Sequence, residues 1–474
     1  MIGGLRTTTS RCAIAAAAGL FLGGLTLTPA VAADLGGDCC ADLEERVAEL
    51  EATTVRKGNR KVSVKLSGQV NRAVMYWDDG GESNVYNVDN INSSTRFRLT
   101  GGAKWKPGWS VNYLIEIQVP GANSLGVNQI DDDGGVGGDA ALSGRKMAMN
   151  IKSDQLGTLW WGRYSPVTDD IILINLGGTG AGATSDIQLV GGGMFLRDSG
   201  SVTANQGSAG LLTGTRWRDL APGLDTSRRE GIRYDSPSLH GFVFSAFWGE
   251  DDYWDVGVHF AKQWNSVRVA FGLGYFEDTD DEPDAQFEDG NSEFSEFKGS
   301  ASIWHVPTGL FASGAWLHRE FDGTGSQDTQ PFAVTRAGQP ASARKRPDFD
   351  YWYVQAGIRR GFFSAGHTSI YGEYAEGEDA LVGSNFACNT CVSGGTGIFF
   401  GDDIDEVTKS DIEVWGFGVV QRIDAAATEL FLTYRHFEAD IAGWDLAGGG
   451  LPQQLVTAPL EDLDIVYAGG RIKF

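Results

Sequence analysis

The stretch KVSVKLSGQVNRAVMYW, residues 61–77, changes between apolar and polar side chains at almost every step. Its odd positions are mostly polar, and Arg72 interrupts the pattern. Successive side chains of a β-strand point to opposite faces, so this alternation predicts a strand with one apolar and one wet face. The apolar face carries Val62, Val64, Leu66, Val70, Val74 and Tyr76.

The same period of two continues to the C-terminus. In SVNYLIEIQV, residues 110–119, Val111, Tyr113 and Ile115 alternate with more polar neighbours. We predict sixteen such strands and an all-β chain. They cover residues 61–77, 94–105, 109–119, 144–152, 157–164, 229–236, 241–250, 253–262, 265–276, 294–305, 309–320, 350–360, 367–376, 411–422, 428–437 and 463–474.

The connections between these segments alternate in length. Short turns such as Lys106–Gly108 and Ser153–Leu156 are followed by long loops, except at Gly249–Asp252. An even number of strands with short turns at one end and long loops at the other is typical of transmembrane barrels. A β-sandwich would not keep every second connection short, and a β-propeller would show a sequence repeat. We therefore expect a closed, antiparallel, sixteen-stranded transmembrane β-barrel over residues 61–474.

The aromatic residues near the strand ends and the C-terminal sequence are both typical of an outer-membrane barrel. Many Trp and Tyr residues, Trp77, Trp105 and Trp109 among them, fall near strand ends, where aromatic girdles meet the membrane interface. The chain closes with DIVYAGGRIKF, in which Phe474 shares the apolar face with Ile472. This ending resembles the C-terminal signature of outer-membrane proteins.

The N-terminal 60 residues are expected to lie outside the barrel. Arg6 and Arg11 accompany an apolar stretch and small residues follow at 30–33, so residues 1–33 fit a secretory signal peptide. The apolar stretch is shorter than the ~20 residues of a transmembrane helix. Residues 34–60 then form a periplasmic segment with a short heptad helix through Leu43, Val47 and Leu50, or a solvated linker.

Composition excludes some partners and chemistries. The chain has 38 basic and 62 acidic residues and a net charge of −24, so no nucleic-acid partner is expected. The six His residues are scattered, and neither G-x-S-x-G nor H-E-x-x-H occurs, so the chain is not expected to be an enzyme. The Gly-rich run at 177–185 has no Gly-Lys-Ser/Thr, and no cofactor is expected.

The cysteines predict disulfides in an exported chain. Cys12 lies in the leader, Cys39 and Cys40 follow it, and Cys388 and Cys391 form a C-x-x-C. The two pairs would bridge within a loop or between subunits, and a four-Cys zinc site is the alternative. A calcium site at the DDDGG run, residues 131–135, is a second metal alternative, but no metal ligands are assigned.

Four stretches identify a family resemblance. They are LEERVAELEATTVRKGNRKVSVKLSGQVN (43–71), GTLWWGRYSPVTDD (157–170), IRYDSPSLHGF (232–242) and the terminal GGRIKF. With them the chain resembles alphaproteobacterial porins of the Rhizobium and Brucella type. The resemblance implies a homotrimeric barrel in the outer membrane of a Gram-negative bacterium, through which small hydrophilic solutes diffuse passively. The Cys pairs and the acidic stretch 277–293 depart from any family pattern.

The longest connection, residues 165–228, is the third on the long-loop side, where such porins fold a constriction loop inward. We expect it to present Asp169, Asp170 and Asp186 to the lumen, facing basic side chains of the wall. Opposed charges would create a transverse field, although some arginines have Glu116 or Glu230 as local partners. The expected basic residues are Arg96, Arg98, Arg145, Arg163, Arg229 and Arg233.

Acidic loops and the loop carboxylates favour a mild preference for cations. Outer-membrane lipid and lipopolysaccharide are the expected surroundings of the barrel. Two other functions stay open: a channel selective for a sugar or organic acid, and a non-conducting adhesin or structural outer-membrane protein.

Overall fold

The computed structural model describes residues 61–134, 142–199, 211–250, 252–279, 294–321, 347–382, 404, 406–445 and 454–474. The predicted signal peptide, the segment 34–60 with its helix, and Cys39, Cys40, Cys388 and Cys391 lie outside these ranges and stay predictions.

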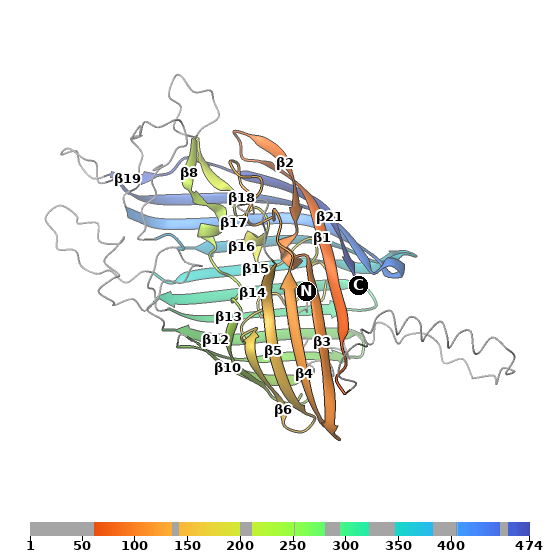
Figure 1. The fold of residues 1–474 in the computed structure, drawn as a ribbon. Coiled ribbons are helices and arrows are strands. Elements are labelled where there is room, and N and C mark those ends of the chain that lie inside the picture. The colour runs from red at the N-terminus through yellow and green to blue at the C-terminus, as the bar shows by residue number, and fades with distance from the viewer. Residues whose placement is uncertain are drawn as a thin grey trace.

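Sixteen antiparallel strands form a closed ring, which confirms the predicted barrel (Figure 1). The ring closes because β21 pairs with β1, placing Ile472 opposite Val70. In ring order the strands are β1 (Lys65–Asp78), β3 (Arg96–Lys106), β4 (Trp109–Gln118), β5 (Ser143–Ser153), β6 (Gly157–Tyr164), β9 (Arg229–Asp235), β10 (Phe242–Gly249), β11 (Tyr253–Trp264), β12 (Val267–Asp278), β13 (Phe294–His305), β14 (Leu310–Phe321), β15 (Phe349–Phe363), β16 (Gly366–Glu378), β17 (Glu406–Ile423), β18 (Thr428–Asp445) and β21 (Leu463–Lys473).

Short additional elements lie on the long-loop side. β2 (Ser83–Asp89) pairs with the end of β1, and β19 (Gln454–Thr457) pairs with β18. A separate small sheet joins β7 (Phe195–Asp198), β8 (Leu211–Arg216) and β20 (Leu460–Glu461). The described residues also contain four 3-10 turns: η1 (Ile91–Ser93), η2 (Ile187–Leu189), η3 (Trp217–Leu220) and, in the short turn between β17 and β18, η4 (Asp424–Ala426).

The tight turns follow from local sequence. Between β3 and β4 the chain reverses through Pro107 and Gly108, and Gly108 has a φ of 73°. A type II turn takes Pro at its second position and needs a positive φ at its third, which Gly adopts without strain. Turns of this kind fix the register of the strands they join.

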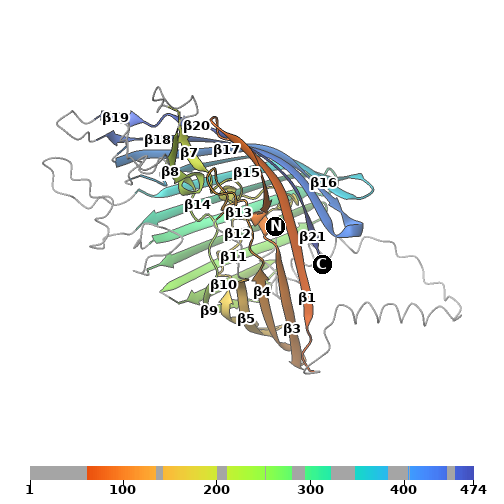
Figure 2. The ribbon, with the colours of Figure 1, turned by 45° about the horizontal axis from the view of Figure 1, so that its top comes forward.

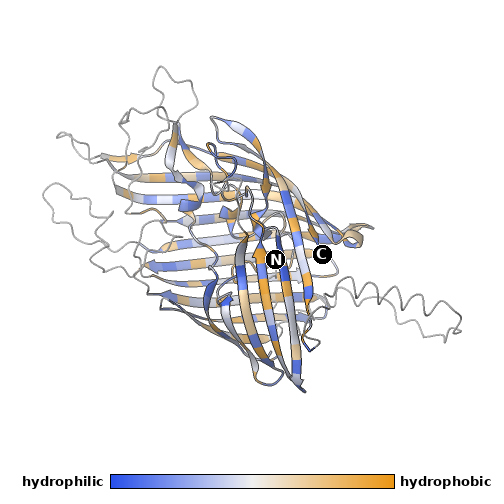
Figure 3. Ribbon diagram, in the orientation of Figure 1, coloured by the Kyte–Doolittle hydropathy of each residue, from blue (hydrophilic) through white to orange (hydrophobic). Residues whose placement is uncertain are grey.

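The outward faces of the strands are apolar. Val74, Leu273 and Val354 are 50%, 43% and 47% exposed, whereas neighbours such as Met75 and Tyr353 point inward and are buried. Figure 3 shows the hydrophilic and hydrophobic residues alternating along the ribbons. An apolar outer band with all strand backbone groups paired is what a bilayer demands of a barrel. Within the described ranges, no helix is long and apolar enough to cross a membrane.

We call residues 165–228 the inner loop, and its described parts, residues 165–199 and 211–228, run inside the ring of strands (Figures 1 and 2). Ile172, Ile187 and Trp217 of this loop are at most 2% exposed. They belong to one apolar core with inward residues of the wall, and the Trp217 ring lies 5.7 Å from that of Phe437 on β18. The inner loop therefore fills one side of the barrel with packed side chains.

Close approach explains two glycines of the inner loop. A Cβ on Gly177 would lie 2.3 Å from the ring of Phe311 on β14. Gly191 has a φ of 86°, and a Cβ there would lie 2.1 Å from Ile465 on β21. A side chain at either position would push the loop off the wall.

Candidate functional site

A cluster of basic side chains lies on the inner faces of β3, β4 and β5. Its centre is Glu116, which is 1% exposed and lies 3.3 Å from Arg96 Nη1 and 3.0 Å from Arg145 Nε. Arg98 makes a further ion pair with the other carboxylate oxygen. One buried carboxylate thus holds three guanidinium groups, a net excess of two positive charges.

The start and end of the inner loop face this cluster. Asp169 Oδ2 lies 3.8 Å from Lys146 Nζ on β5, and Asp169 Oδ1 lies 3.5 Å from an Arg228 nitrogen. Burial opposes ionisation of Asp169, but Arg228 and Lys146 outweigh it and hold its pKa below the usual value. The Asp170 amide donates to Asp225 Oδ1 at 2.8 Å. Burial and the nearby charges of Asp169 and Asp170 raise the pKa of Asp225.

Three carboxylates, Asp169, Asp170 and Asp225, have oxygens within 4.8 Å of one another. Such a group of oxygens could coordinate a hard cation. Here Lys146 and Arg228 already meet Asp169, so two amino-acid cations supply the neutralising charge. The cluster is therefore an ion-pair network between loop and wall.

The remaining predicted residues lie elsewhere. Arg229 pairs with Asp278 on β12 at 2.5 Å, and Arg233 pairs with Asp235 at 2.8 Å, so both are engaged with wall carboxylates. Asp186 lies deeper in the loop, at the start of η2, and does not join Asp169 and Asp170.

Arg163 lies on the opposite face of its strand from the lumen. Trp160 and Tyr164 of β6 are buried with their rings stacked 4.3 Å apart, so the intervening odd positions point outward. Leu159 on that outward face is 43% exposed, and Arg163 pairs in register with outward-facing Met147. Arg163 therefore lies on the outer face of the barrel, and the expectation that it lines the lumen is wrong.

Sequence reasoning missed Lys146, Arg228 and Asp225. The register between β4 and β5 shifts between Glu116 and Ile117, where Arg145 is the extra residue of a β-bulge. A bulge breaks the period of two, so Arg145 and Lys146 both reach the basic cluster although they are consecutive. Arg228 and Asp225 lie just before β9, and their proximity to a strand end is the one signal the sequence offers.

Three buried arginines of the wall anchor the inner loop, each held by a wall carboxylate. Arg435 on β18 pairs with Glu373 at 2.7 Å and donates to the carbonyl oxygens of Thr184 and Ile187 at 3.1 and 3.2 Å. Arg319 pairs with Glu296 in the same way and donates to the carbonyl oxygens of Pro222 and Gly223. Arg233 pairs with Asp235 and donates to the carbonyl oxygens of Ser165 and Pro166.

Smaller groups complete this attachment. The Ser302 hydroxyl accepts from the Leu176 amide at 2.9 Å, and the Ser369 hydroxyl donates to the Gly177 carbonyl at 2.6 Å. Arg359 donates to the Leu176 carbonyl at 2.9 Å. Backbone groups buried inside a barrel must find partners, and serine and arginine side chains of the wall provide them.

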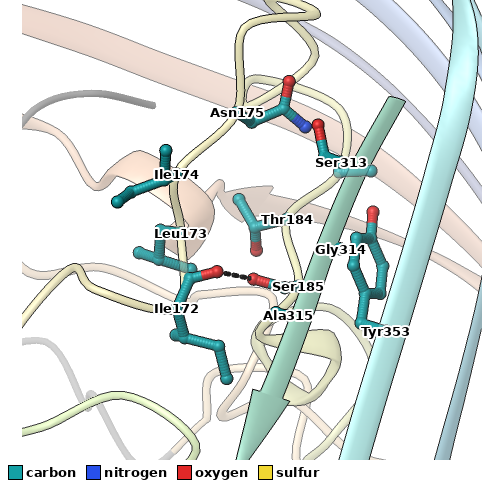
Figure 4. Close-up of a pocket in the computed structure, with 11 residues that line it drawn as sticks. Ile172, Leu173, Ile174, Asn175, Thr184, Ser185, Ser313, Gly314, Ala315 and Tyr353 are labelled. Carbon is teal, nitrogen blue, oxygen red and sulfur yellow. Dashed lines mark hydrogen bonds between the residues drawn. The ribbon is translucent and has the colours of Figure 1, made fainter. Parts of the chain in front are cut away.

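Little free space remains between the inner loop and strands β14 and β15 (Figure 4). The cavity there has a volume of about 10 Å³ and is lined by Ile172, Asn175, Ser313 and Tyr353, among others. It is closed on the loop side by a hydrogen bond from the Ser185 hydroxyl to the Ile172 carbonyl at 2.6 Å. A space of this size is near the lower limit for one water molecule, so this cavity is too small for a solute.

The β3–β4 side of the lumen differs from the rest. Within the described ranges, no hydrogen bond joins the inner loop to β3 or β4. The side chains of Arg96, Arg98 and Arg145 remain 16%, 25% and 16% exposed, and Arg228 across from them is 23% exposed. In the described part of the chain, β3 and β4 contribute no residue to the apolar core that holds the loop, so the basic wall and the facing loop residues border the part of the lumen that this core leaves unfilled.

A family model described as Gram-negative porin matches residues 13–443 of the chain. A search of curated proteins finds no match. Among solved structures, the anion-selective porin of Comamonas acidovorans is similar, with 14% identity, a TM-score of 0.48, and coverage of 87% of this chain and 100% of that chain. OmpF of Salmonella typhi, solved with daunomycin, has 11% identity, a TM-score of 0.44, and coverage of 89% and 100%.

Removing the anchor at β18 is expected to loosen the inner loop. Arg435→Met deprives the Thr184 and Ile187 carbonyls of their donor and leaves Glu373 as a buried charge, at a cost of about 3–5 kcal/mol. The double variant Arg435→Met/Glu373→Gln removes the stranded charge and isolates the loss of the anchor. Both should give noisier single-channel currents and faster proteolysis within the inner loop.

Arg422→Met is the matched control for this anchor. Arg422 pairs with Asp424 at 2.7 Å beside a short turn, and both side chains are about half exposed. Loss of such a pair costs little, so currents and proteolysis should match the unaltered protein. Quiet currents in the double variant would show that Arg435 does not hold the loop.

Asp186 is expected to make stability depend on pH. Burial raises its pKa from 3.8 to about 6, against the opposing effects of Gln188, Lys298 and Arg435. The folded protein therefore binds this proton more tightly than the unfolded chain, and stability falls as pH rises from about 4 to about 6. Asp186→Asn should raise the unfolding temperature in detergent by a few degrees at pH 7.5, and the gain should vanish near pH 4. An equal gain at both pH values would contradict this assignment.

Proposed function

Because this chain belongs to the Gram-negative porin family, we propose that the passage between the inner loop and the β3–β5 wall carries its solutes. The protein is a porin of the outer membrane and a channel rather than an enzyme, and small hydrophilic solutes cross it by passive diffusion. The observation that supports the route is the partly exposed basic wall at Arg96, Arg98 and Arg145, opposite a loop that is packed against other strands.

The passage is lined by charged and amide side chains. Below the arginines, Asn112 donates to Asn150 at 2.8 Å across β4 and β5. Hydrated ions and polar solutes exchange water for such groups at little cost. This lining favours general diffusion over a sugar channel, whose sliding track would need aromatic faces along the passage.

Three further features are proposed from the resemblance. The protein assembles as a homotrimer, it contacts lipopolysaccharide through its outer surface, and it belongs to the alphaproteobacterial branch of the family. The predicted heptad within residues 34–60 supports the trimer, since three short helices could pack together in the periplasm.

Single-channel recording in planar bilayers tests the general function. Conductance should rise in proportion to KCl concentration without saturating, because no binding step limits diffusion. Deletion of residues 175–215 should increase conductance several-fold, since residues 175–199 and 211–215 form no strand of the ring and the buried ones among them pack against its inner wall. The exposed apolar wall will lower thermal stability, so circular dichroism of the purified variant must first establish that it is folded. An unchanged conductance in the folded variant would refute the inward path of the loop as the constriction.

Trimer assembly has its own measurement. Protein extracted in mild detergent should migrate on a native gel at three times the mass of a chain, and heating should convert it to monomer. Removal of residues 34–60 should lower the conversion temperature if the heptad contributes. A monomer before heating would refute the proposed assembly.

A further inference from the structure

The inner faces of the strands that border the passage carry many more cations than carboxylates. Strand alternation and the bulge in β5 place seven Lys or Arg side chains there and one carboxylate, Glu116. The seven are Lys65, Arg96, Arg98, Lys104, Arg145, Lys146 and Lys152.

These charges occur in cross-strand rows. The row nearest the long loops contains Arg96 opposite Gln118, and the next contains Arg98, Glu116 and Lys146. In the third row, Thr100–Leu114–Ala148, Lys65 of β1 lies opposite Thr100, and the fourth row, Gly102–Asn112–Asn150, is neutral. The row at the short-turn end is basic again, with Lys104 and Lys152 on either side of Ser110. Positive charge therefore lies at both ends of the wall.

The facing loop does not cancel this charge. It contributes Asp169, Asp170 and Asp225 but also Arg228. Asp169 is already shared by Lys146 and Arg228, so its charge is largely used within the network. With the loop included, eight cations face four carboxylates along the passage.

From this balance we infer that the passage prefers anions, and that its solutes include small carboxylates and phosphates, which guanidinium groups bind well. This inference rests on the proposed diffusion route and specifies its solute class. It replaces the mild cation preference expected from the acidic loops and from Asp169 and Asp170, because Lys146 and Arg228 offset the charge of Asp169. Fixed charge acts most strongly where the passage is narrow and ions lie within a Debye length of the wall.

The overall acidity of the chain does not oppose this inference. Carboxylates at the long-loop end of β16, β17 and β18, such as Glu376, Glu413 and Glu438, face outward from the barrel. Their field in the lumen is screened by the barrel wall, by water and by salt, whose screening length is about 8 Å at physiological ionic strength. The nearest fixed charges therefore decide which ions enter the narrow section.

Reversal potential in a KCl gradient across a planar bilayer tests the inference. With an anion preference, chloride diffuses faster than potassium and the dilute side becomes negative. Arg98→Gln should lower the chloride-to-potassium permeability ratio about two- to threefold, as expected for one charge ~6 Å from the ion path in a water-like dielectric. Lys65→Gln/Lys104→Gln alters two exposed side chains away from the ion-pair network and should shift the ratio in the same direction.

Lys262→Gln is the matched control. Lys262 of β11 lies at the short-turn end of the barrel, as Lys104 does, but it shares the outward face of its strand with Trp254 and Val256. Its replacement should therefore leave the permeability ratio unchanged. A dilute side that becomes positive in the unaltered protein overturns the anion preference while leaving the channel function intact. Absence of any conductance would instead refute the proposed function. An equal shift in Lys262→Gln and Arg98→Gln would also overturn the inference, because the charge of the β3–β5 wall would then not set selectivity.

Discussion

The structure depends on satisfying the buried backbone of a loop inside a barrel. Strands of the ring pair with one another, but residues 165–194 form no strand and are largely buried. Buried arginines supply hydrogen-bond donors to the loop backbone at three places. One guanidinium group can bind a wall carboxylate and still donate to two loop carbonyl oxygens. The carboxylate keeps the guanidinium charged and oriented, and the carbonyls keep the loop in place.

This arrangement determines where the passage lies. The anchors come from β9, β14 and β18, and apolar packing fills the space beneath the loop. Among the described residues, β3 and β4 make no hydrogen bond to the loop and contribute no residue to the apolar core, so the opening is left beside them. The same residue type therefore has two uses: arginines with a carboxylate each fix the loop, and arginines that share one carboxylate leave an excess of charge facing the passage.

The barrel could be predicted from the sequence because alternation of apolar and polar residues is a direct consequence of strand geometry. Each of the sixteen segments overlaps a strand of the ring. β2 and β19 were not predicted, since short strands that extend beyond the membrane have no need of an apolar face. Alternation also placed Arg96 and Arg98 on the inner wall, and counting back from Tyr164 would have placed Arg163 outside.

The parts of the site that escaped prediction depend on departures from alternation. Lys146 reaches the lumen beside Arg145 because of the bulge opposite Glu116, and no pattern of residue types marks that bulge. The charge on Asp169 is offset by groups 23 and 59 positions away in the chain, which only the fold brings together. Net charge is likewise a poor guide to ion selectivity, because it ignores where the charges lie in the fold. A total of −24 sums over loops, outer surface and lumen alike, whereas an ion in the narrow section responds to the few charges within about a Debye length. The sign of selectivity is therefore a property of the local geometry of β3, β4 and β5, and composition favoured the opposite sign.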